Sequence, residues 1–222
     1  MKNKTWIIAG LIVLALLFWL YKALSKPIPG EVVTPLGRDH VTDIAGIKYN
    51  SNPPTSGSHF PVWAKPGVYD RLISDGYFLH SMEHGYIVIW YDCSRLSSVS
   101  LVKVAYAHDE PTQESTDSGQ FLMHMKVKPT SEMSWITPEN QPEEEVKLPE
   151  SFTSDACKNL VGELSTFTKV AQRVIVTPRM NLDTAIALTA WGRIDKLNSV
   201  EKERIEAFIK AFHNQGPEKT TE

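Results

Sequence analysis

The longest apolar segment of the chain lies near its N-terminus. Residues 6–21 read WIIAGLIVLALLFWLY and contain no charged side chain, whereas lysines precede and follow the run. A helix needs about 17–25 residues to cross a bilayer, and the run is close to that length. Trp6 and Trp19 lie near the two ends, where aromatic rings prefer the headgroup zone. We predict a cytoplasmic tail over residues 1–5 and a transmembrane anchor over residues 6–24.

The same segment also fits a cleaved secretory signal, because Ala23-Leu24-Ser25 places small residues where a signal peptidase could cut. The apolar run exceeds the about 7–15 residues of a usual signal core, which favours the anchor. Lysines before the run favour an N-terminus inside the cell. Both interpretations export the rest of the chain. We therefore expect a single-pass cell-membrane protein whose C-terminal domain lies outside the cytoplasm.

Short runs of alternating or β-branched residues further along the chain predict strands. They follow a linker, residues 25–37, in which Pro27 and Pro29 cannot continue a helix. Alternation and β-branching suit a pleated, half-buried surface. The predicted strands are residues 46–49, 86–91, 121–127, 173–177 and 184–191.

Two segments have the spacing of amphipathic helices. Apolar residues recur at helical intervals after Ser154, whose side chain can cap the first turn. The second helix is predicted to follow Asn198, with Glu201 in a capping position, and to end at Gly216-Pro217. Because strands and helices do not alternate regularly, we predict an α+β fold with a mostly antiparallel sheet and a C-terminal helix.

The part of the chain after the linker has the length of one ordinary domain. We predict one compact extracytoplasmic domain over residues 38–216, with a polar excursion at about residues 95–150 and a flexible tail over residues 217–222. The net charge is −3 and no basic block occurs, which argues against a nucleic-acid partner. The sequence identifies no protein partner; the membrane, contacted through residues 6–24, is the partner we expect.

The chain has two cysteines, Cys93 and Cys157. In an exported domain they are expected to form a disulfide, since the compartment is oxidising. Two buried thiols are the alternative.

Four histidines precede the strand predicted at residues 86–91: His40, His59, His80 and His84. If residues 75–84 form a helix, positions 80 and 84 lie one turn apart on the same face and can bind one cation. His59 ends a stiff loop rich in proline, glycine and hydroxyl residues, which can present a ligand. The alternative is a polar core in which these imidazoles bond to the backbone.

The segment His80-Ser81-Met82-Glu83-His84 also has the spacing of the inverted zincins, in which the glutamate activates a water for hydrolysis. In that hypothesis Glu83 is the general base. The helix can be only about two or three turns long before Gly85, and no flanking motif supplies a third ligand. Met123, His124 and Met125 are side chains of the types that bind Cu(I), but their pattern favours plain strand packing, in which methionines fill gaps.

Several motifs together resemble an exported bacterial family, the domain of unknown function 3105. They include Asn52-Pro53-Pro54-Thr55-Ser56-Gly57-Ser58-His59, His80-Ser81-Met82-Glu83-His84-Gly85 and Ala190-Trp191-Gly192-Arg193. The likeness spans nearly the whole exported part and implies no activity. The resemblance implies that His40, His59, His80, Glu83 and His84 are characteristic polar residues and that the two cysteines match a recurrent pair. The segment between those cysteines is longer here than in the family pattern.

These observations favour a membrane-anchored protein that binds a transition metal, copper or zinc, through His40, His59, His80 and His84. The sequence favours binding over catalysis. Its alternatives are a structural or interaction domain of the cell envelope and a zinc-dependent hydrolase that uses Glu83.

Overall fold

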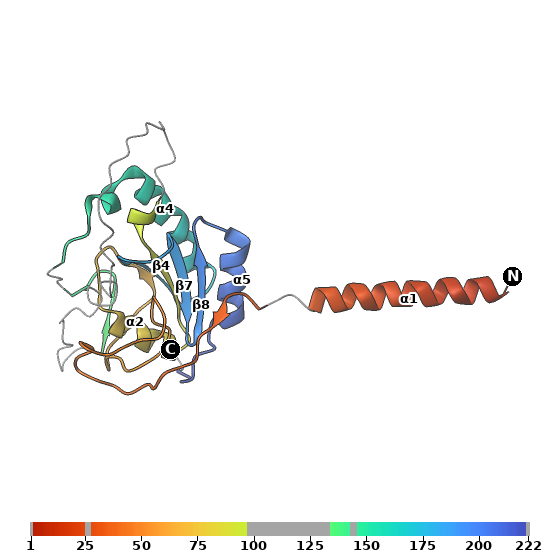
Figure 1. Ribbon diagram of the computed structural model, residues 1–222, viewed down its shortest axis with the longest axis horizontal. Helices are drawn as coiled ribbons and strands as arrows, with labels where there is room; N and C mark the ends of the chain where they lie inside the picture. Colours follow the sequence, from red (N-terminus) through yellow and green to blue (C-terminus); the bar gives the residue numbers. More distant parts are fainter. Residues whose placement is uncertain (1, 25–27, 97–133, 143–145, 221–222) are drawn as a thin grey trace, which may run out of the picture.

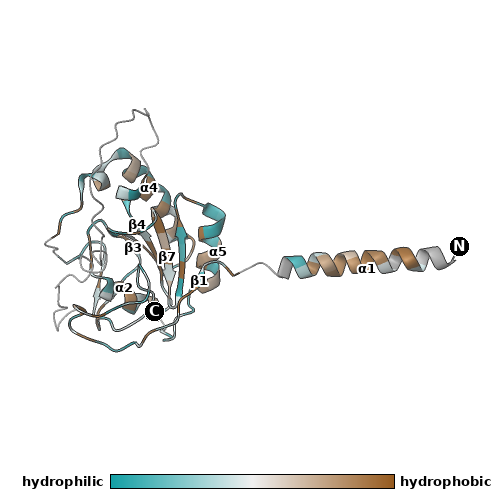
Figure 2. Ribbon diagram, in the orientation of Figure 1, coloured by the Kyte–Doolittle hydropathy of each residue, from teal (hydrophilic) through white to brown (hydrophobic). Residues whose placement is uncertain are grey.

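The computed structural model describes residues 2–24, 28–96, 134–142 and 146–220 (Figure 1). Its first helix, α1 (Lys2–Leu24), extends away from the folded domain as a separate rod (Figure 1). Large apolar side chains along α1 are exposed, and Figure 2 shows the middle of the helix in hydrophobic colours and the end nearest the domain as hydrophilic.

The helix over the apolar N-terminal segment forms as expected, but its predicted passage through a membrane is not confirmed. In the described ranges, no helix combines the length and the apolar character that crossing a membrane requires. The charge-free run of residues 6–21 is about 24 Å long at 1.5 Å per residue, against a hydrocarbon core of about 30 Å.

A six-stranded sheet forms the centre of the domain, with the strand order β1-β8-β7-β4-β6-β3. Strands β4 and β7 pair antiparallel, as do β7 and β8, and β8 and β1; β6 runs parallel to both β4 and β3. The predicted α+β fold with a mostly antiparallel sheet is therefore confirmed. The strands are β1 (Glu31–Val32), β3 (Gly67–Val68), β4 (Ile87–Tyr91), β6 (Val174–Pro178), β7 (Ile186–Ala190) and β8 (Arg193–Leu197).

Not every strand predicted from the sequence is present among the described residues. Residues 46–49 form no strand; Gly46 has a positive φ of 81° in a turn that the hydrogen bond from Ile47 N to Ile44 O closes. The strand predicted at residues 121–127, with the Met123, His124 and Met125 pattern, lies outside the described residues. Strand β8 was not predicted, because its sequence, RIDKL, is short and two adjacent charged residues, Asp195 and Lys196, interrupt the alternation.

Both faces of the sheet are covered, because alternate residues of β4 point to opposite sides. Ile87 and Ile89 pack with α4 (Asp155–Ser165) and α5 (Lys202–Phe212), whereas Val88 and Trp90 pack with α2 (Asp75–Glu83). Every residue of β4 is buried, which explains its continuous apolar sequence. A parallel pair, β2 (Trp63–Ala64) with β5 (Trp135–Ile136), lies beside α2.

The two predicted amphipathic helices are α4 and α5. Ser154 caps α4 as expected, its hydroxyl accepting a hydrogen bond from Cys157 N at 3.2 Å. The start predicted after Asn198 is wrong, since α5 begins at Lys202 and Glu201 makes no capping bond. The helix ends at Phe212, before the predicted stop, because Asn214 takes a left-handed conformation with φ 60°.

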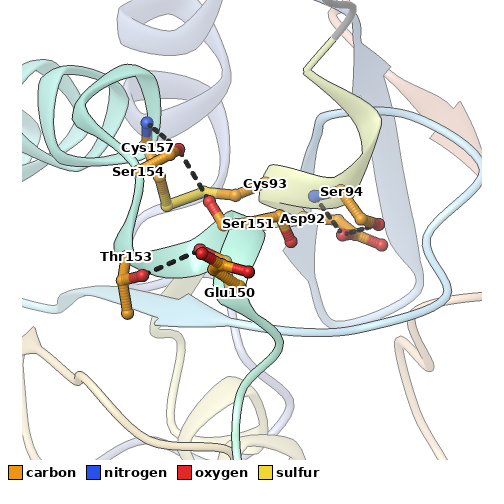
Figure 3. Close-up of a disulfide and its surroundings, with 8 residues drawn as sticks. All are labelled: Asp92, Cys93, Ser94, Glu150, Ser151, Thr153, Ser154 and Cys157. Atoms are coloured by element: carbon orange, nitrogen blue, oxygen red, sulfur yellow. Dashed lines mark hydrogen bonds between the residues drawn. A yellow bond between two sulfur atoms is a disulfide. The ribbon is translucent and has the colours of Figure 1, made fainter.

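A disulfide joins Cys93 to Cys157, which confirms the expected pairing over two separate thiols (Figure 3). Cys93 begins a short 3-10 helix, η1 (Cys93–Arg95), directly after β4, and Cys157 lies in the first turn of α4. Asp92 caps η1 through a hydrogen bond from Ser94 N. The bridge therefore fastens α4 to the end of the central strand, on the face of the sheet opposite α2.

Candidate metal centre

Helix α2 carries two of the polar side chains that form the site. Ser74 caps its first turn by accepting from Gly76 N, and every residue of the helix is buried. Gly85, with φ 83°, reverses the chain after the helix and leads into β4. His80 and Glu83 lie three positions apart in α2, so their side chains share one face.

The loop that ends at His59 provides the third side chain, and a neighbouring segment provides the fourth. A parallel β-bridge joins His40 to His59: Val41 N donates to His59 O at 2.8 Å, and His59 N donates to Asp39 O at 3.0 Å. Farther back in the loop, Asn52 Nδ2 donates to Asn181 O at 2.9 Å. Backbone pairing thus brings together two histidines that are distant in sequence.

Among the described residues, one ligand atom from each of His40, His59, His80 and Glu83 lies within 4.8 Å of the others. His59 Nε2 is 3.0 Å from Glu83 Oε2, and His40 Nε2 is 3.8 Å from the same oxygen. The rings of His40 and His80 stack with centroids 4.7 Å apart. Atoms bound to one ion at about 2.1 Å lie about 3–4 Å apart, so a small contraction would complete the coordination. The group could hold a metal ion.

Two backbone carbonyls fix the orientation of the buried rings. His59 Nδ1 is 2.8 Å from Gly57 O, and His80 Nδ1 is 2.7 Å from Phe60 O. A carbonyl oxygen only accepts, so each Nδ1 carries the proton and each neutral ring has a lone pair on Nε2. Metal-bound histidines usually donate their other ring nitrogen in this way.

The pairing of His59 with Glu83 is the most informative contact in the site. In the neutral tautomer fixed by Gly57, His59 Nε2 presents a lone pair to a carboxylate oxygen 3.0 Å away. Two acceptors at this separation repel each other unless a proton or a cation lies between or beside them. Both side chains are almost fully buried, at 0% and 3% exposed, so bulk water does not screen that repulsion.

Burial also acts on the protonation of the two inner histidines. The pKa of His80 is lowered to about 3, mainly by burial. The neighbouring histidines also lower this pKa, whereas the hydrogen bond to Phe60 O raises it. Burial likewise lowers the pKa of His59 below its usual range, although Gly57 and Glu83 oppose the shift. Both rings are therefore neutral near pH 7, which is the form that binds metal.

The fourth histidine predicted as a ligand, His84, does not belong to this group. Its backbone ends α2 with φ −82° and ψ 8°, and its Nε2 lies 3.8 Å from Glu218 Oε2. Its ring nevertheless packs edge to face against His80, with centroids 4.6 Å apart. Glu83, which the sequence suggested as the general base of a hydrolase, takes the fourth place.

Sequence reasoning missed two basic residues around the site. Arg38 Nη1 lies 3.3 Å from Glu83 Oε1, and the side chain of Arg38 is 57% exposed. Arg179 forms a two-point contact with Asp75 at the start of α2, and both side chains are 2% exposed. Nothing in the local sequence distinguishes Arg38, whereas Arg179 lies two residues after the strand-like run at residues 173–177.

A comparison with family models finds one match, described as "Protein of unknown function (DUF3105)", which covers residues 40–148 and 151–222. The match contains all four residues of the candidate site and both cysteines. No curated protein and no solved structure matches the chain.

Proposed function

The chain belongs to the DUF3105 family of proteins of unknown function, and we propose that it binds a transition metal ion, copper or zinc, through His40, His59, His80 and Glu83. The facing lone pair of His59 and carboxylate of Glu83, 3.0 Å apart and buried, carry the proposal. A cation held between these atoms turns a repulsive contact into two coordination bonds.

The donor set supports a transition metal over calcium or magnesium. Three imidazole nitrogens and one carboxylate oxygen suit zinc and copper, whereas calcium and magnesium prefer oxygen ligands only. Glu83 replaces His84 as the fourth ligand in this proposal, because His84 Nε2 lies beside Glu218. His84 acts instead as a packing partner of the His80 ring.

Elemental analysis of the purified chain tests the proposal. We expect about one copper or zinc ion per chain in the wild type, and less than a tenth of that in His59→Ala and His80→Ala. His213→Ala is the matched control, since His213 caps α5 and lies outside the ligand group. Equal and negligible metal in the wild type and in His80→Ala would show that the group is a polar core only.

Glu83→Gln distinguishes binding from hydrolysis. As a ligand, Glu83 contributes both a charge and a donor oxygen, so the glutamine variant is expected to lose metal affinity at least tenfold. If Glu83 were instead the general base of a hydrolase, the variant would keep its metal and lose only turnover. Retention of full metal content in Glu83→Gln would therefore contradict its assignment as a ligand.

We further propose that the domain works outside the cytoplasm, attached to a membrane through residues 6–24. The disulfide between Cys93 and Cys157 supports this location, because such bonds persist in oxidising compartments. The exposed apolar side chains of α1 support the attachment, since a helix that is apolar on all sides is unfavourable in water. Lysines at both ends of the run suit the charged headgroup zone.

A further inference from the structure

At the candidate metal centre, the exposed side chains among the described residues that contact Glu83 belong to one segment, residues 38–40. His59, His80 and Glu83 are buried, whereas the side chains of His40 and Arg38 are 46% and 57% exposed. Among the described residues, the segment 38–40 therefore offers an external molecule an approach to the metal. This inference rests on the proposed metal-binding function.

Arg38 has donors left for such a molecule. Its guanidinium has five N–H groups, and among the described residues it makes one hydrogen bond, from Nη1 to Glu83 Oε1 at 3.3 Å. That contact is longer than the about 2.7–2.9 Å of a strong charge-assisted bond. The Arg38 guanidinium is thus held only loosely, and it lies beside the Glu83 carboxylate rather than buried among the proposed ligands.

The charge of a loaded site favours an anion at this position. A divalent ion, three neutral imidazoles and one carboxylate together have one positive charge, and Arg38 adds a second. Asp39, next to Arg38 in the chain, is exposed and is the carboxylate nearest in sequence that opposes this charge. A planar guanidinium matches the two oxygens of a carboxylate, carbonate or phosphate, and oxygen atoms of such anions also bind metals.

Arg38 and the metal would also be close enough to share one small anion. The two oxygens of Glu83 divide between them, with Oε1 toward Arg38 and Oε2 toward His40 and His59. A carboxylate therefore already spans the distance between the guanidinium and the ligand atoms. We propose that the metal centre binds a small oxyanion, which coordinates the metal with one oxygen and accepts hydrogen bonds from Arg38 with another.

Calorimetric titration of the metal-loaded full chain in detergent, with acetate, bicarbonate or inorganic phosphate as the probe, tests the proposal. We expect one anion per bound metal, at least tenfold weaker binding in Arg38→Gln, and intermediate binding in Arg38→Lys, which keeps the charge but not the planar fork. Anion binding is expressed per bound metal ion, so that any change in the metal content of a variant is separated from the loss of the anion. Arg71→Gln is the matched control, since Arg71 is similarly exposed and pairs with Asp70.

The outcomes separate this inference from the function on which it rests. Metal-loaded chain that binds none of the three anions, or binds them equally well in Arg38→Gln, overturns the oxyanion site and leaves the metal site intact. Equal anion binding by metal-free chain overturns it as well. A wild-type chain that takes up no metal overturns both proposals.

Discussion

The buried pair of Arg179 and Asp75 gives a stability prediction that can be worked out from the structure. Arg179 Nε and Nη2 contact the two carboxylate oxygens of Asp75 at 3.2 and 3.0 Å, and each side chain is 2% exposed. Arg179 also donates to Asn52 Oδ1 and lies over the Trp90 ring. Arg179→Met keeps most of the apolar volume but leaves the Asp75 carboxylate buried without its cation.

Breaking one partner of a buried pair costs about 3–5 kcal/mol, because the remaining charge is neither hydrated nor neutralised. For a domain of this size, each 1 kcal/mol lowers the Tm by about 2–4 °C, so the expected decrease is about 6–20 °C. Urea unfolding followed by tryptophan fluorescence measures the free energy, and a thermal melt measures the Tm.

The double variant Asp75→Asn/Arg179→Met serves as the control. It removes both charges, so we expect it to be more stable than Arg179→Met alone, even though it lacks the same contacts. A free energy of unfolding for Arg179→Met within about 1 kcal/mol of the wild-type value would contradict this prediction, because a difference of that size is typical of any substitution. The prediction also fails if the double variant is no more stable than the single one, because then the isolated charge is not the cause.

Two further predictions concern the C-terminal segment and the location. A Cβ at Gly216 would lie within 3.0 Å of Glu83 O and Gly85 N. Gly216→Ala should therefore displace the C-terminal segment, in which Glu218 N donates a hydrogen bond to Glu83 O. We expect the free energy of unfolding in urea to fall by about 1–3 kcal/mol and metal binding to weaken. Gly162→Ala, in an open position of α4, is its control and should be neutral or stabilising; equal effects of the two would contradict the packing argument. In cell fractionation, the chain should sediment with membranes, and deletion of residues 2–24 should release it. Alkylation without reductant should label neither cysteine. A cytosolic chain with free thiols would refute the location.

Local patterns in the sequence were enough to find the long central strands and the amphipathic helices, but not the two-residue strands β1, β2, β3 and β5. The buried strands β4 and β6 and the helix α4 follow from apolar runs, helical spacing and a capping serine, all of which act within about ten residues. The helix at residues 75–84 was only a condition of the metal hypothesis, and the structure has it as α2. Strand β8 was not predicted because the adjacent charged residues Asp195 and Lys196 interrupt the alternation that is typical of a strand. The strand predicted at residues 46–49 was wrong because Gly46 adopts a positive φ that a strand does not contain.

The candidate site shows where sequence reasoning stops. The helical spacing of His80 and His84 correctly suggested adjacent rings, 4.6 Å apart between centroids. It did not show that residue 84 lies beyond the last helical turn, where its imidazole approaches Glu218. Glu83, one residue earlier and still within α2, therefore occupies the position that His84 was expected to take.

The sequence by itself determined the residue types of the site, an apolar N-terminal helix, an α+β domain and two cysteines able to pair. Only the tertiary structure decided which polar residues meet, since the bridge between His40 and His59 joins segments 19 positions apart and Arg38 reaches a residue 45 positions away. Spacing along a helix or strand is set by local geometry, whereas contacts between loops depend on how the sheet and its covering elements pack. For that reason the sequence indicated a histidine cluster, and the fold assembled three of its histidines with Glu83.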